Sequence, residues 1–190
     1  MSVIGLLLAA GSASRFGSDK LRHKLPHGVP IAVQSARHLR AEAARVIAVV
    51  RSSDLAALLS DEGCEAVVFE NASEGMGASL ACAARAAGRA DGYLVALADM
   101  PFIRRASIAA VRAALEAGAP LAAPYFRGRR GHPVGISGAF FDSLLDLQGD
   151  EGAKRLLREN DSRLVKVPVG DPGVLRDIDT PSDLAPPIAV

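Results

Sequence analysis

The stretch Leu8-Ala9-Ala10-Gly11-Ser12-Ala13-Ser14-Arg15-Phe16-Gly17-Ser18-Asp19-Lys20 carries the strongest prediction in the sequence. The apolar run Val3–Leu8 leads into it and is typical of a buried parallel strand. The small residues that follow let backbone N–H groups approach an anion, and Arg15 and Lys20 supply positive charge. The spacing differs from the dinucleotide pattern G-x-G-x-x-G and from the loop G-x-x-x-x-G-K-[ST]. This stretch therefore predicts a polyphosphate-binding loop of another kind.

Strand-like and helix-like patterns alternate along the remainder of the chain. Such alternation predicts an α/β fold, in which helices cover both faces of a parallel sheet. No linker or internal repeat interrupts it, so we expect residues 1–190 to form a single domain. The patterns predict strands at 3–8, 45–50, 66–69, 93–97, 121–123, 134–136 and 164–167, and helices at 31–44, 54–62, 79–87, 108–117, 138–147 and 152–160.

The composition excludes several classes of protein. Hydrophobic residues make up 49% of the chain but aromatic residues only 4%, which predicts a core of Ala, Val and Leu. A net charge of +1 gives no electrostatic case for nucleic acid or membrane partners. No segment reaches the ~18 apolar residues that span a bilayer. Cys64 and Cys82 have neither metal-ligand spacing nor a disulfide framework, which favours a cytoplasmic location.

Asp99 is the second strong feature. It follows the apolar strand predicted at 93–97, and Pro101 prevents that strand from continuing. Ligands of open α/β sheets bind at the carboxyl ends of the strands, which places Asp99 near the glycine loop. A carboxylate beside a triphosphate is suited to hold Mg²⁺. The alternative is that Asp99 caps the following helix.

Two further loops have polar or flexible compositions. The glycines of Gly75-Met76-Gly77-Ala78-Ser79 would let backbone pack on a flat ring while Ser79 offers a hydroxyl; alternatively, the segment is a turn with Ser79 as helix cap. The second loop is cationic and contains Arg127, Arg129, Arg130 and His132. It either faces a phosphorylated substrate or is a solvated surface, and His132 is alternatively a turn residue.

Two acidic segments lie later in the chain. Alternation places Asp177 and Asp179 on one side of an extended segment, where one of them would complete a Mg²⁺ site begun by Asp99. We favour Asp179, and the alternative is a turn with a helix cap. The segment 149–154, Gly-Asp-Glu-Gly-Ala-Lys, is most simply a capped helix start whose acids complement the helix dipole.

Together these motifs resemble one family. The stretch 8–20 is similar to the signature L-A-[AG]-G-x-[SG]-x-R-[MF]-G-x-D-K of MobA-like nucleotidyltransferases, which include molybdenum cofactor cytidylyl- and guanylyltransferases. Segments 98–101, 75–80, 128–133 and 177–184 resemble the family's [DG]-[MQ]-P, G-[LM]-x-x-S, G-[RH]-x-G-H-P and D-I-D-T-P-x-D-L elements. The chain departs from the family at Arg22-His23-Lys24, where a short apolar run is usual, and the contact of Lys24 is left open.

The resemblance implies a three-layer α/β/α sandwich with a Rossmann-like, mostly parallel sheet of the nucleotide-diphospho-sugar transferase type. It also implies transfer of a nucleotidyl group from an NTP to a phosphorylated acceptor, with release of pyrophosphate. By the same resemblance Arg15, Lys20 and Asp99 are catalytic, Asp99 and Asp179 bind the Mg²⁺ cofactor, and Arg130 and His132 bind the acceptor. The nucleotide-binding residues it implies are Leu8, Ala9, Ala10, Gly11, Ser14, Arg15, Lys20, Gly77 and Ser79.

Ala10 favours the cytidylyl branch, which tends to have A-A-G where guanylyltransferases have A-G-G. The resemblance therefore implies CTP and molybdopterin or the molybdenum cofactor as substrates, and a molybdoenzyme or its chaperone as protein partner. Guanylyl transfer, another NTP and acceptor, and a non-catalytic nucleotide-binding accessory protein are the alternatives. A dehydrogenase, in which Arg51 would meet a 2′-phosphate, is disfavoured by the glycine spacing.

Overall fold

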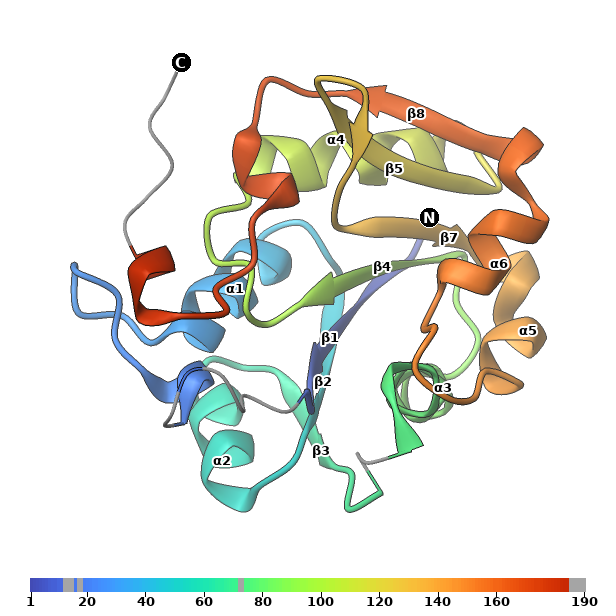
Figure 1. The fold of residues 1–190 in the computed structure, drawn as a ribbon. Coiled ribbons are helices and arrows are strands. Elements are labelled where there is room, and N and C mark those ends of the chain that lie inside the picture. The colour runs from blue at the N-terminus through green and yellow to red at the C-terminus, as the bar shows by residue number, and fades with distance from the viewer. Residues whose placement is uncertain (12–15, 17–18, 72–73, 185–190) are drawn as a thin grey trace.

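A mixed, mostly parallel sheet of eight strands forms the centre of the molecule (Figure 1). The computed structural model describes residues 1–11, 16, 19–71 and 74–184. The strand order is β3-β2-β1-β4-β7-β5-β6, and β8 pairs with β5 on its other side. The strands are β1 (Val3–Ala9), β2 (Arg45–Val50), β3 (Glu65–Val68), β4 (Gly92–Leu97), β5 (Leu121–Phe126), β6 (Arg129–Arg130), β7 (Val134–Ser137) and β8 (Leu164–Pro168).

Helices cover both faces of this sheet, which confirms the predicted three-layer arrangement. One core cluster joins the sheet to α1 (Ile31–Arg40), α2 (Ser53–Asp61) and α4 (Arg105–Glu116). The other joins it to α3 (Met76–Ala87), α5 (Phe141–Leu145) and α6 (Lys154–Glu159). Successive strand residues alternate between the two clusters, as pleated backbone requires: Leu7 packs with the first and Leu8 with the second.

The strand directions explain where a ligand site forms. β1 runs parallel to both β2 and β4, whereas β7 is antiparallel to β4 and β5. From β1 the chain builds the sheet outward through β2 and β3, and then returns to the other side of β1 as β4. Such a reversal leaves a crevice at the carboxyl ends of the two central strands, where ligands bind in open α/β sheets.

Several predicted helix boundaries were wrong. The N-cap of α2 is Ser52, whose hydroxyl accepts a hydrogen bond from the Leu55 amide at 3.3 Å, and not Asp54. The helix predicted from Ser79 begins at Met76, with Gly75 as its N-cap. The helix predicted at 152–160 is shorter, and its N-cap is Ala153, without a side-chain cap.

Across the described residues, no helix is both long and apolar enough to cross a membrane.

Candidate active site

A cavity of about 580 Å³ opens at the carboxyl ends of β1 and β4. Its walls include the predicted nucleotide-binding residues Leu8, Ala9, Ala10, Gly11, Lys20 and Ser79. Two residues predicted to bind the metal, Asp99 and Asp179, also line it. The structure therefore brings the loop after β1 and the acid after β4 into one site, as the strand order requires. Ser14 and Arg15, predicted to contact the nucleotide, lie outside the described residues.

Three carboxylates gather at one end of this cavity. One oxygen from each of Asp99, Asp177 and Asp179 lies within 4.8 Å of the other two. The amide of Ile178 donates to the Asp99 carbonyl oxygen at 2.9 Å, and the Ile178 side chain is fully buried. Because side chains alternate along this extended segment, burying Ile178 turns both flanking acids toward Asp99. The sequence reasoning favoured Asp179 alone, whereas the structure places Asp177 in the same cluster.

Lys20 supplies a positive charge to this cluster. Its Nζ lies 2.9 Å from Asp99 Oδ2 and 3.5 Å from Asp179 Oδ1. Only 9% of the Lys20 side chain is exposed, so its ammonium group has lost most of its hydration. A buried cation is tolerated when it is paired in this way. Lys20, the last residue of the predicted phosphate loop, therefore contacts the carboxylates directly.

The glycines at the start of α3 pack closely against the segment 148–150. The Gly77 amide donates to the Gly149 carbonyl oxygen at 2.6 Å, and a Cβ added at Gly77 would lie 2.5 Å from the Gln148 carbonyl oxygen. Gly75 has a φ of +100° and would place a Cβ against Asp150. These glycines make room for the segment 148–150, and Gly75, not Gly77, lines the cavity.

Ser79 lies inside α3 and is not its cap. Its hydroxyl donates to the Gly75 carbonyl oxygen at 3.1 Å, and the side chain is buried in the cavity wall.

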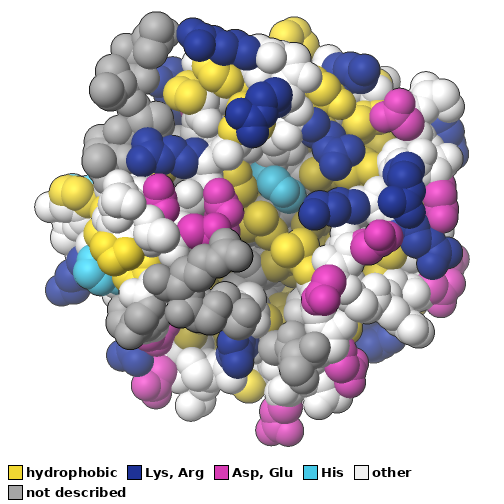
Figure 2. All heavy atoms as spheres, viewed as in Figure 1, with side chains coloured by type: hydrophobic (Ala, Val, Ile, Leu, Met, Phe, Trp, Pro, Cys, Tyr) yellow, Lys and Arg dark blue, Asp and Glu magenta, His cyan; other side chains and the backbone are white. Residues whose placement is uncertain are grey.

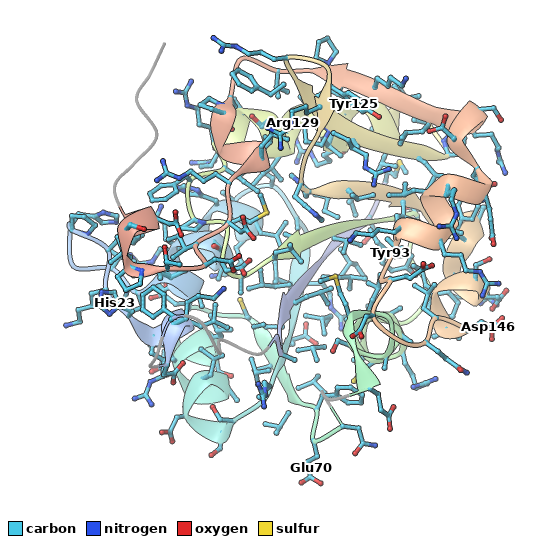
Figure 3. All side chains as sticks on the ribbon, in the orientation of Figure 1. His23, Glu70, Tyr93, Tyr125, Arg129 and Asp146 are labelled. Carbon is cyan, nitrogen blue, oxygen red and sulfur yellow. The ribbon has the colours of Figure 1, made fainter. Side chains whose placement is uncertain are left out.

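The predicted acceptor residues lie on or after the β5–β6 hairpin. Arg130 pairs with Tyr125 across the hairpin, whose outer end carries Arg129 (Figure 3). The backbone amide of His132 donates to the Val174 carbonyl oxygen at 2.9 Å, while its ring Nδ1 is buried without a hydrogen-bond partner among the described residues. Burial lowers the pKa of His132 to about 4, and the neighbouring Val95 backbone offsets only part of this shift. The ring is therefore neutral at pH 7.

Charges of both signs act on the ring of His132. The positive charges of Arg130 and Lys154 lower the pKa of its ring, and the negative charge of Asp177 raises it. Figure 2 shows a histidine near the middle of this face, between acidic side chains on one side and Lys and Arg side chains on the other. His132 is therefore within electrostatic range of Asp177 as well as of Arg130 and Lys154.

Sequence reasoning did not select two charged residues of the cavity wall for this site, Arg51 and Asp150. Arg51 directly follows β2, so the rule that located Asp99 at a carboxyl strand end would also have found it. Asp150 had been interpreted as a helix-capping acid, but it precedes α6 and lines the cavity. No pattern within the segment 149–154 signals this role, because it depends on packing against Gly75 and Gly77.

Comparisons with known proteins agree with this geometry. The family described as "MobA-like NTP transferase domain" matches residues 5–164. Purine catabolism protein PucB of Bacillus subtilis is 30% identical over 95% of this chain and 93% of its own length. The crystal structure of Rv0371c from Mycobacterium tuberculosis superposes with a TM-score of 0.81 at 26% identity, covering 96% of this chain and 94% of that one.

Further solved structures share the fold at lower identity. A manganese complex of Rv0371c has a TM-score of 0.77 at 24% identity and covers 96% of each chain. A nucleotidyl transferase from Methanothermobacter has a TM-score of 0.80 at 24% identity, covering 96% of this chain and 94% of that one. From the match over residues 5–164 and from the relative at 30% identity, the chain belongs to the MobA-like NTP transferase domain family of nucleotidyltransferases.

Proposed function

We propose that this protein, acting as a single domain over residues 1–190, transfers CMP from CTP to a phosphorylated acceptor, most simply molybdopterin or the molybdenum cofactor. The observation that carries the proposal is the single cavity in which the loop Leu8–Gly11, Lys20 and Asp99 meet. The loop offers small residues and backbone donors, Lys20 offers charge, and the carboxylates offer metal ligands. That combination is suited to hold a triphosphate with its α-phosphate beside the acids.

The carboxylate cluster fits a divalent cation such as Mg²⁺. Oxygens from Asp99, Asp177 and Asp179 within 4.8 Å of one another provide the hard ligands that such ions prefer. A related structure was determined with manganese, an ion of similar ligand preference. When bound, the ion would neutralise charge on the triphosphate and polarise the α-phosphate.

The chain's own residues then position the reactants. A phosphate oxygen of the acceptor forms a bond to the α-phosphorus, the bond from that phosphorus to the bridging oxygen breaks, and pyrophosphate leaves. The nucleophile is already ionised at neutral pH, so the site needs no general base. Lys20 shares the negative charge of the departing pyrophosphate, and Arg130 and His132 orient the acceptor. Catalysis rests on positioning and on charge neutralisation.

The preference for CTP is supported by Ala10, which lines the cavity where a guanylyltransferase would have glycine. The name of the Bacillus relative associates that protein with purine catabolism. A guanylyltransferase acting on the same class of acceptor is the second candidate.

The test measures pyrophosphate release by the purified protein with Mg²⁺, molybdopterin and each of CTP, GTP and ATP. We expect turnover with CTP and an acceptor product that carries CMP. A preference for GTP would replace the nucleotide assignment. Binding of CTP, detected by a thermal shift, without turnover of any nucleotide would instead indicate an accessory binding protein.

A further inference from the structure

The segment 148–154 connects the nucleotide cavity to the surroundings of His132. At its start, Gly149 accepts the hydrogen bond of Gly77, and Asp150 lines the cavity. At its end, Lys154 begins α6. Leu156 and Leu157 of that helix are buried in the same core cluster as Val134, which lies two residues after His132. The packing of α6 therefore carries Lys154 to the His132 side of the site.

Arg130 reaches the same side of the sheet by a different route. It pairs with Tyr125 across the β5–β6 hairpin, so the two side chains point to the same face. Tyr125 packs against the core cluster that contains α6, which places Arg130 on that face as well. Two cations from distant parts of the sequence thus converge beside one ring.

Neither cation has a counter-charge of its own. Among the described residues, the side chains of Lys154 and Arg130 make no ion pair or hydrogen bond, although the Lys154 amide donates to the Glu151 carbonyl oxygen. Both charges lower the pKa of the His132 ring. The buried Nδ1 of that ring is itself without a partner in the described part of the chain. Two unpaired cations on one face fit an anionic ligand better than a plain solvated surface.

We propose that Lys154 binds the phosphate group of the acceptor together with Arg130, and that this contact holds the nucleophilic oxygen in front of the α-phosphate. The inference rests on the proposed function and adds a residue to its acceptor site. A phosphate monoester with nearly two negative charges matches two cations. The negative charge of Asp177 also acts on the His132 ring, so a phosphate held here would lie near the carboxylate cluster and a metal ion bound there.

The chain offers a matched control on the same helix. Arg155, the next residue, is exposed, and its Nε lies 2.9 Å from Glu159 Oε1. Replacing Lys154 or Arg155 by methionine removes one cation from α6 in each case and leaves Leu156 and Leu157 in place. Only Lys154→Met should affect the acceptor.

The first experiment compares steady-state kinetics of the wild type, Lys154→Met, Lys154→Arg and Arg155→Met with molybdopterin and CTP. We expect Lys154→Met to raise the KM for the acceptor by about tenfold to a hundredfold, the usual effect of losing one charge-assisted bond. The KM for CTP should stay constant, Lys154→Arg should recover most of the loss, and Arg155→Met should match the wild type. An unchanged acceptor KM, or equal changes in both KM values, would overturn the inference.

A second measurement separates this inference from the proposed function. If the wild type turns over no acceptor, binding of inorganic phosphate can still be followed by the width of its ³¹P resonance. We expect the wild type and Arg155→Met to broaden the resonance, whereas Lys154→Met and Arg130→Met should not. This result would support the anion site independently of turnover. Broadening lost only in Lys20→Met would place all phosphate binding at the nucleotide loop and refute the role of Lys154.

Discussion

The ammonium group of Lys20 lies 2.9 Å from Asp99 Oδ2, although the two residues are 79 positions apart in the sequence. Asp99 is also a member of the carboxylate cluster, so the same side chain can serve both Lys20 and a metal ion. The buried amine thus partly neutralises the cluster in the protein alone. A divalent cation bound at this cluster would compete with Lys20, and a bound triphosphate would offer the amine a new partner.

Replacement of Lys20 by methionine should therefore have two opposite effects. Turnover of CTP should fall sharply because the triphosphate loses a cation, whereas Mn²⁺ should bind the nucleotide-free protein more tightly because nothing competes for Asp99. Kinetics and Mn²⁺ binding followed by electron paramagnetic resonance check both effects. Lys24→Met, an exposed lysine that does not line the cavity, is the control. Weaker Mn²⁺ binding in Lys20→Met would show that the amine does not compete for the site.

Asp99→Asn should abolish most activity and spare the fold. The amide keeps the size of the side chain and an oxygen for Lys20, and it relieves repulsion among the three acids, so the thermal midpoint should change little. Turnover at saturating Mg²⁺ should drop by more than about tenfold, or ~1.4 kcal/mol in the barrier. Asp146→Asn, on the surface after α5 (Figure 3), should retain wild-type turnover. Activity above a tenth of wild type in Asp99→Asn would rule out the metal-ligand role.

Ala10→Gly should shift the nucleotide preference from CTP toward GTP. Ala10 lines the cavity, and removing its methyl group enlarges the space for a base. One methyl group is worth only ~1–3 kcal/mol of discrimination, so we expect a partial shift. The ratio of kcat/KM for CTP and GTP measures it, and an unmoved ratio would place the selectivity in other residues.

Gly77→Ala should destabilise the protein and impair nucleotide binding. The added Cβ would lie 2.5 Å from a backbone oxygen of Gln148, which cannot move as a flexible side chain would. Overpacking of this kind costs about 1–3 kcal/mol, more than the ~1 kcal/mol that alanine gains over glycine in a helix. Urea unfolding should show a net loss, and Gly170→Ala, where a Cβ meets open space, should be neutral. Equal stability of the two variants would contradict the close packing of 148–150 on α3.

Acidification should weaken the fold through His132. Its pKa is about 4 in the folded protein and 6.5 in the reference state. Between these values the unfolded chain binds the proton and the folded chain does not, so stability is complete above pH 6.5 and falls as the pH drops toward 4. Burial also lowers the pKa of His38, which adds to the same slope. The urea midpoints of unfolding at pH 7 and pH 5 should differ less for His132→Gln than for the wild type. An equal difference in the two proteins would refute the contribution of His132 to this pH dependence.

The strands could be predicted from sequence because their signals are local. Apolar runs such as residues 45–50 mark buried strands, and β2 has those same bounds. The position of Asp99 at a carboxyl strand end followed from fold rules alone. The contact of Lys20 with Asp99 and the close approach of Asp150 to Gly75 could not be predicted, because each joins segments that are far apart in the sequence. The antiparallel direction of β7 likewise depends on its pairing with β4 and β5.

The bond between Ile178 and Asp99 has a consequence for the synthesis of the protein. Two of the three clustered acids lie after β8, so a nascent chain that has emerged only as far as residue 168 contains every strand of the sheet but only one of those acids. Affinity for a divalent cation would then arise only when Ile178 packs against the rest of the folded protein. Chains that stop before residue 177 would carry the sheet with only one of the three clustered acids.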